Sequence, residues 1–151
     1  MKVYRIDKST YKDEFPPKGS LYGVGRWNTK DMWVVYTSDS IALAKLETFA
    51  NSIIFPKNKI LRVIEIRDDA PVIEITRDDL PDHWNTIPYP PILASMIKAL
   101  LATKAYVAAI VPSVQSPKEK NILLFPDYPD FPKYVKEIEQ LEESFDPRFN
   151  M

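Results

Sequence analysis

Cysteine is absent from this chain of 151 residues, and histidine occurs once, at His83. The chain therefore has no disulfide, no thiol nucleophile and no zinc site built on cysteine ligands. One histidine also excludes a histidine-rich metal site, and we expect no bound metal. Any catalysis must rest mainly on carboxylates, hydroxyls, arginines and lysines, which the sequence has in ordinary numbers.

An excess of charge of one sign is also missing, as are long hydrophobic runs. Twenty basic and twenty-one acidic residues give a net charge of −1, without the basic surplus that phosphate-backbone binding needs, so we expect no direct binding of nucleic acid. No apolar run approaches the roughly 18–20 residues that span a bilayer, and residues 1–10 lack the apolar core of a secretory signal. We therefore expect a cytoplasmic protein without a membrane segment.

Glycine is scarce, with three residues against fourteen prolines. Gly19, Gly23 and Gly25 fall within seven residues, which concentrates close backbone approaches in one loop. The prolines mark joints between elements. Residues 1–151 are expected to form one α+β domain with a mixed sheet. The elements that we expect are strands at 3–6, 32–37, 60–67, 72–75, 106–111 and 122–125, and helices at 41–51, 92–103 and 132–143.

Glu47 is the first candidate for chemistry. At about 100° per residue, Leu43 lies about 40° from Glu47 around the expected helix, and Ala44 lies about 60° away. Glu47 therefore projects from the apolar face of its own helix. Because burial of a lone carboxylate is unfavourable, such a position needs a partner or a catalytic purpose. A glutamate at the helix edge that reaches water or pairs with an arginine is the structural alternative.

The loop sequence from Gly23 to Asn28 is the second candidate. Its glycines let a backbone approach a ligand, Arg26 can grip a phosphate through two hydrogen bonds, and Trp27 can stack on a flat ring. Taken alone, the segment is better explained as a tight loop with a core tryptophan. Tyr36 and Ser113 follow as candidates because each lies at the end of an expected strand, where side chains often line a site.

In this order and spacing, the motifs resemble the RES-domain family, the toxins of RES–Xre toxin–antitoxin systems. The arginine, glutamate and serine that give the family its name correspond to Arg26 in Gly25-Arg26-Trp27-Asn28, Glu47 in Ala42–Glu47, and Ser113 after Val111-Pro112. The chain departs from the family pattern at Val24, where a second glycine usually stands. Further matches are Tyr4-Arg5-Ile6, Val35–Ser38, Leu80-Pro81 with Trp84, Pro117–Asn121 and Phe145–Arg148.

The resemblance implies a fold similar to that of ADP-ribosyltransferases and diphtheria-type toxins. It implies NAD+ as substrate rather than as a bound cofactor, with cleavage of the nicotinamide–ribose bond by hydrolysis or phosphorolysis. It also implies an Xre-type antitoxin that covers the active site. Glu47, Arg26, Tyr36 and Ser113 would then act in catalysis. The residues expected to bind NAD+ are Arg5, Arg26, Trp27, Asn28, Tyr36, Ser113 and Asn121.

Three other functions stay open at this point. The first is mono-ADP-ribosylation of a protein, which differs from hydrolysis only in the acceptor that reaches the ribose. The second is a catalytically inactive module that retains only the antitoxin-binding role. The third is a small carbohydrate-binding module built on Trp27, Trp33 and Trp84, which requires those three rings on one exposed face.

Overall fold

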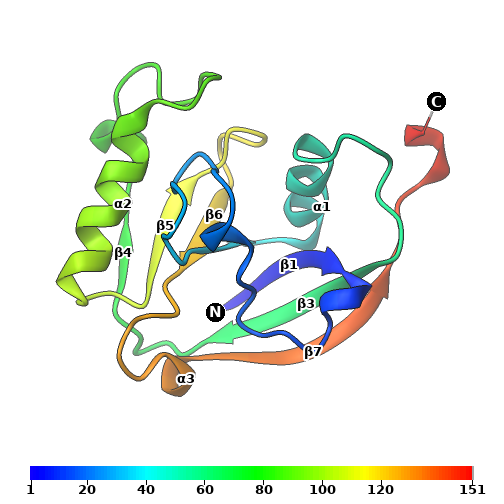
Figure 1. The fold of residues 1–151 in the computed structure, drawn as a ribbon, viewed down its shortest axis with the longest axis horizontal. Coiled ribbons are helices and arrows are strands. Elements are labelled where there is room, and N and C mark those ends of the chain that lie inside the picture. Colours follow the sequence, from blue (N-terminus) through cyan, green and yellow to red (C-terminus); the bar gives the residue numbers. More distant parts are fainter. Residues whose placement is uncertain (151) are drawn as a thin grey trace.

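Seven strands form one sheet in the order β4-β5-β6-β2-β1-β3-β7 (Figure 1). The computed structural model describes residues 1–150. β4 and β5 run parallel and all other neighbours run antiparallel, which confirms the expected mixed sheet and α+β class. The strands are β1 (Lys2–Lys8), β2 (Val35–Ser38), β3 (Lys59–Ile66), β4 (Val72–Glu74), β5 (Ala108–Pro112), β6 (Lys120–Leu124) and β7 (Val135–Glu143).

Two of the three expected helices are confirmed, α1 (Ile41–Ala50) and α2 (Pro91–Thr103). The side chain of Ser40 accepts a hydrogen bond from the Leu43 N–H at 3.1 Å and so caps α1. Pro91 occupies the first position of α2, where its missing N–H removes no helical bond. α1 packs on β1 and β2, whereas α2 lies beside β4 and β5 (Figure 1). Within residues 1–150, no helix has the length and apolarity needed to cross a membrane.

The expected helix at 132–143 is wrong. Only α3 (Phe131–Tyr134) is helical there, and β7 then pairs with β3 along its whole length. The register shifts between Val63, which faces Glu139, and Ile64, which faces Glu137, so Ile138 has no partner on β3. At this bulge the alternation of apolar and polar residues typical of a strand is broken. The apolar residues Val135, Ile138 and Leu141 are three apart, a spacing that is also typical of a helix. The open edge of β3 outweighs the helical propensity of the segment.

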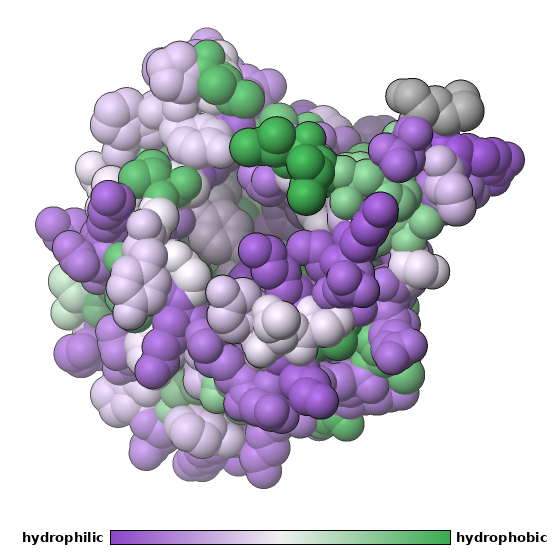
Figure 2. Space-filling view, turned by 45° about the vertical axis from the view of Figure 1, so that its right-hand side comes forward, coloured by the Kyte–Doolittle hydropathy of each residue, from purple (hydrophilic) through white to green (hydrophobic). Residues whose placement is uncertain are grey.

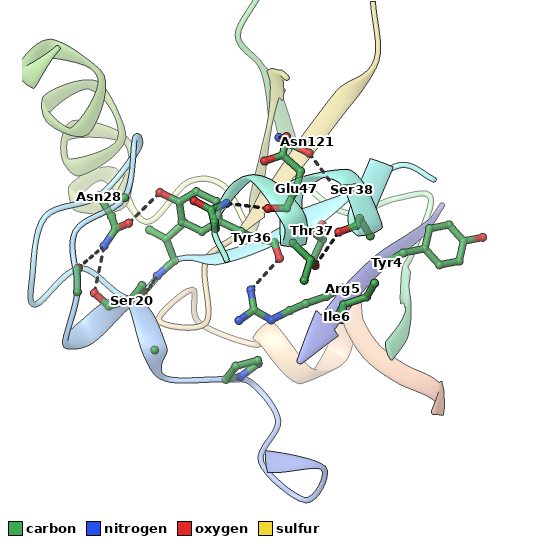
Figure 3. Close-up of a pocket in the computed structure, with 18 of the residues that line it drawn as sticks. Tyr4, Arg5, Ile6, Ser20, Asn28, Tyr36, Thr37, Ser38, Glu47 and Asn121 are labelled. Carbon is green, nitrogen blue, oxygen red and sulfur yellow. Dashed lines mark hydrogen bonds between the residues drawn. The ribbon is translucent and has the colours of Figure 1, made fainter. Parts of the chain in front are cut away.

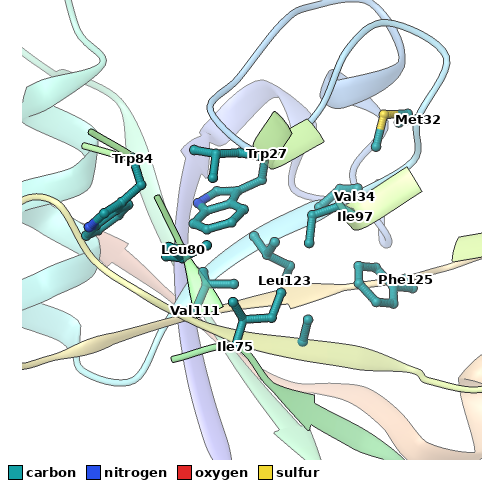
Figure 4. Close-up of a cluster of buried hydrophobic side chains, with 12 residues drawn as sticks. Trp27, Met32, Val34, Ile75, Leu80, Trp84, Ile97, Val111, Leu123 and Phe125 are labelled. Atoms are coloured by element: carbon teal, nitrogen blue, oxygen red, sulfur yellow. The ribbon is translucent and has the colours of Figure 1, made fainter. Parts of the chain in front are cut away.

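The core lies on both faces of the central strands. Ala109 and Val111 of β5 belong to a cluster under α2, whereas Ala108 points to a second cluster on the opposite face. Burial on both faces explains why residues 106–111 form an uninterrupted apolar run. The cluster under α2 includes both Trp27 and Trp84, with ring centroids 6.4 Å apart (Figure 4).

The buried tryptophans exclude the carbohydrate-binding module. Trp27 is 3% exposed and Trp84 is 6% exposed, and the Nε1–H of Trp33 donates to the Pro17 carbonyl at 2.8 Å. The three rings therefore do not form the exposed face that such a module requires. Their apolar surface stabilises the fold instead.

Candidate active site

The main cleft opens where β1 and β2 separate. These strands pair only at Tyr4 and Ser38, whereas β1 pairs with β3 through all seven of its residues. The gap, closed above by α1 and at the side by the glycine loop (residues 19–28), forms a cavity of about 620 Å³ that we call the large lobe (Figure 3). That volume is in the range of pockets that hold cofactor-sized ligands.

A second cavity of about 150 Å³, the small lobe, adjoins the first. Residues that line both lobes form the boundary between them. These are Val24, Gly25, Tyr36, Glu47, Asn51 and Asn121.

Glu47 lies at the boundary because α1 turns the face that carries it toward the sheet. Leu43 and Ala44, on the same face, are buried, as the helical spacing predicts. Glu47 Oε1 accepts hydrogen bonds from Ser113 Oγ at 2.8 Å and from Asn121 Nδ2 at 3.0 Å. Oε2 has no hydrogen-bond donor within residues 1–150. One carboxylate oxygen is therefore held by the protein, and the other remains for a ligand or a reaction intermediate.

The two donors to Glu47 are themselves fixed by neighbouring strands. Asn121 on β6 accepts from Ser38 Oγ at 2.9 Å through Oδ1, which orients its amide nitrogen toward Glu47. Ser113 follows β5, is fully buried, and accepts from the backbone N–H groups of Gln115 and Ser116 at 3.1 and 3.2 Å. Ser113 lines neither lobe, so its geometry suits positioning of Glu47 rather than contact with a ligand.

Tyr36 joins the sheet to the glycine loop. Its hydroxyl donates to Asn28 Oδ1 at 2.8 Å and accepts from the Trp27 N–H at 3.0 Å. Burial raises the pKa of the Tyr36 phenol above its usual range, so the hydroxyl stays protonated at neutral pH and keeps its bond to Asn28. A Cβ on Gly25 would lie 2.6 Å from this hydroxyl. Glycine is thus required at position 25 for the approach of the loop to Tyr36.

The predicted binding residues Trp27 and Asn28 both turn inward. Asn28 is 2% exposed, and its Nδ2 donates to the carbonyls of Ser20, Gly23 and Thr29 at 3.0–3.1 Å. Trp27 packs in the core against Trp84. Both residues therefore shape the loop that walls the cleft. The structure contains the core tryptophan that the loop sequence favours. Trp27 is 3% exposed and also lines the small lobe.

The two predicted phosphate-binding arginines lie in different lobes. Arg5 lines the large lobe, and its Nη1 donates to the Tyr36 carbonyl at 2.9 Å. Arg26 lines the small lobe, where its Nη1 donates to the carbonyls of Trp84 and Thr86, both at 2.9 Å. Burial lowers the pKa of Arg26, whereas the nearby Tyr89, Glu47 and Tyr36 raise it. The guanidinium remains charged at neutral pH.

Sequence reasoning missed two residues at these arginines. The ring centroid of Tyr89 lies 4.7 Å from Arg26 Cζ, and Tyr89 belongs to a segment for which the sequence analysis predicted neither an element nor a site. No local pattern links it to position 26. Asp7, which accepts from Arg5 Nε at 2.9 Å, lies two residues from Arg5 on the same strand and thus on the same face. That spacing was a signal that the sequence already contained.

Comparison with known proteins decides the family. The family model of the RES domain matches residues 2–146. The chain belongs to the RES family. Toxin Res of Yersinia enterocolitica is 31% identical over 152 residues, covering 98% of this chain and 99% of that protein. The Prs ADP-ribosylating toxin of a Sphingobium species is 34% identical over 125 residues, covering 80% and 78%.

A solved structure shares the RES fold at low sequence identity. The crystal structure of the MbcT–MbcA toxin–antitoxin complex from M. tuberculosis matches with a TM-score of 0.70 and 14% identity, over 99% of this chain and 86% of that one. Of the three residues that we matched to the arginine, glutamate and serine of the family's name, Glu47 and Ser113 are in direct contact. Arg26 lies across the small lobe, which Glu47 also lines.

Proposed function

We propose that this RES protein is a toxin that cleaves the nicotinamide–ribose bond of NAD+. The observation that best supports this proposal is the placement of Glu47. Its Oε1 accepts hydrogen bonds from Ser113 and Asn121 at the boundary of two lobes that are each lined by an arginine. The curated relatives support the proposal, since both are named as toxins and one as ADP-ribosylating.

The chemistry follows from the charges. When nicotinamide leaves, the ribose C1′ gains oxocarbenium character, and a fixed carboxylate beside it stabilises the positive charge. Holding Oε1 in advance spares Glu47 the reorganisation that a mobile side chain would need. Arg5 in the large lobe and Arg26 in the small lobe offer positive charge to the diphosphate. The ring of Tyr36 at the boundary stacks against the nicotinamide end.

The acceptor that completes the reaction distinguishes two candidates. Water or phosphate gives a glycohydrolase or a phosphorylase, whereas a protein side chain gives a mono-ADP-ribosyltransferase. The name of the Sphingobium relative favours the transferase as the second candidate. Both classes of acceptor would reach the ribose through the large lobe, which is open to solvent where β1 and β2 separate.

The test is incubation of the purified protein with NAD+, with and without phosphate and a bacterial lysate. Free nicotinamide with ADP-ribose identifies hydrolysis, ADP-ribose phosphate identifies phosphorolysis, and labelled protein identifies transfer. Glu47→Gln serves as the inactive control. If the wild-type protein releases no nicotinamide under any of these conditions, the inactive binding module replaces the enzyme.

An antitoxin that covers the cleft completes the proposal, and we expect it to be Xre-type and to act with the toxin in the cytoplasm. Tyr22, Val24, Ile53 and Ile87 are 64–102% exposed, and each lines the cleft or adjoins a lining residue. Hydrophobic side chains gather beside the hollow in Figure 2. Such a group of apolar residues around a polar cleft is typical of a protein-binding surface. A carboxylate from the antitoxin would pair with the cleft arginines.

Co-expression tests this partner. The chain alone should arrest growth and lower cellular NAD+, and the product of a neighbouring gene should restore both and co-purify with it. Ile53→Asp should weaken the complex, whereas Ile138→Asp, on the edge strand β7, should not. Normal growth on expression of the wild-type chain alone would instead support the inactive module.

A further inference from the structure

The ion cluster behind the large lobe begins at Arg62, a β3 residue that is fully buried. Its Nη2 donates to the carbonyls of Tyr11 and Glu14 at 2.7 and 2.8 Å, and its Nη1 pairs with Glu137. Its Nε donates to Asp7 Oδ2 at 2.8 Å. A buried guanidinium is tolerated only when its donors are matched in this way. All three guanidinium nitrogens of Arg62 therefore have acceptors.

Asp7 connects this cluster to the cleft. The same Oδ2 that accepts from Arg62 also accepts from Arg5 Nε at 2.9 Å. Burial raises the pKa of the Asp7 carboxyl, but the two arginines outweigh it and hold the pKa below its usual value. Asp7 is thus a carboxylate at neutral pH, shared between a buried arginine and one that lines the large lobe.

Arg5 is consequently fixed at two of its three nitrogens. Nε is held by Asp7, and Nη1 is held by the Tyr36 carbonyl across the separation of β1 and β2 (Figure 3). Nη2 makes no hydrogen bond to the protein within residues 1–150. The guanidinium therefore keeps one edge for a ligand, and the direction of that edge depends on Asp7 and on a backbone carbonyl.

We propose that Asp7 is a positioning residue which, held by Arg62, aims the Arg5 guanidinium into the large lobe to bind the diphosphate of a dinucleotide. The proposal rests on the proposed function for the identity of the ligand. The alternative is that Asp7 serves only to neutralise Arg62. Glu137 allows these two roles of Asp7 to be distinguished, because it also pairs with Arg62 and makes no contact with Arg5.

The experiment compares Asp7→Asn with Glu137→Gln as matched charge removals. Asp7→Asn should raise the KM for NAD+ about tenfold, the effect of losing one charged hydrogen bond, with kcat changed less than about twofold. Glu137→Gln should leave KM unchanged. Equal KM values in the two variants, whether raised or unchanged, would overturn the proposal. Adding Asp7→Asn to Arg5→Ala should raise KM no further, since both changes remove the same contact.

Two further measurements keep the test decisive. If Asp7→Asn does not fold, adding Arg62→Met and Glu137→Gln removes both members of the remaining ion pair, and the tenfold KM increase is still expected. If wild-type protein does not bind NAD+, the proposed function fails, and Asp7 is judged by the side-chain NMR signal of Arg5 Nε–H alone. Fast hydrogen exchange of that signal in Asp7→Asn, with slow exchange in Glu137→Gln, supports positioning. Slow exchange in both overturns it.

Discussion

The two lobes of the cleft hold their arginines by different means. In the large lobe, Arg5 is paired with the carboxylate of Asp7, which is also paired with the buried Arg62. In the small lobe, Arg26 is held by two backbone carbonyls and the ring of Tyr89, and no carboxylate of residues 1–150 is bonded to it. Much of the charge of Arg5 is therefore already balanced, whereas Arg26 keeps its charge near Glu47. The large lobe is therefore suited to orienting a ligand. The small lobe supplies more of the positive electrostatic potential that attracts an anionic ligand.

The strongest test of this comparison removes the carboxylate that both lobes share. Glu47→Gln keeps the shape and the hydrogen-bonding oxygen but loses the charge. Turnover of NAD+ should fall by about 10²–10³, the scale measured when one electrostatic group is removed from a transition state. Nicotinamide release measures the loss, and thermal melting checks the fold. An unchanged turnover would contradict the role given to Glu47.

The next test concerns Arg26. Arg26→Ala should weaken NAD+ binding by about 2 kcal/mol, the scale of losing one partner of a desolvated charge interaction. Arg26→Lys should restore only part of it, because an ammonium in place of Nη1 at the Trp84 and Thr86 carbonyls leaves no second nitrogen in a planar fork for the diphosphate. Titration in a Glu47→Gln background separates binding from turnover. Equal affinity with and without Arg26 would assign the diphosphate to Arg5 alone.

Gly25→Ala should damage the boundary between the lobes. The new methyl group would lie 2.6 Å from Tyr36 Oη and 2.7 Å from Asn28 Oδ1, so the loop must move or the hydrogen bond must break. We expect a loss of about 1–2 kcal/mol in the free energy of unfolding, measured in urea. Gly19→Ala is the matched control, since nothing lies within 4 Å of its Cβ. Similar losses in both variants would exclude the steric explanation.

The smallest expected effect belongs to Ser113→Ala. Glu47 Oε1 would keep its bond from Asn121 and lose the one from Ser113, a change of about 1 kcal/mol. Turnover should fall several-fold, and NAD+ affinity should stay the same because Ser113 lines neither lobe. An equal loss of affinity would show that Ser113 contacts the substrate.

Local patterns in the sequence predicted most of the fold. All six expected strands are present within three residues at either end, as are two of the three expected helices. The spacing of Leu43, Ala44 and Glu47 correctly placed the glutamate on the apolar face. The failure at β7 has a physical cause, because a bulge at Ile138 gave an edge strand the spacing of a helix.

What the sequence by itself determined is local: where strands and helices run, which loop needs glycine, and which residues match the RES pattern. Only the tertiary structure decided how those residues act together. Glu47 meets Ser113 and Asn121 across 66 and 74 residues of chain, and Arg5 reaches Tyr36 across 31. Periodicity and capping act within a few residues, whereas these contacts depend on strand order. For the same reason the resemblance only grouped Arg5 and Arg26 as residues that bind NAD+, whereas the sheet put them in separate lobes.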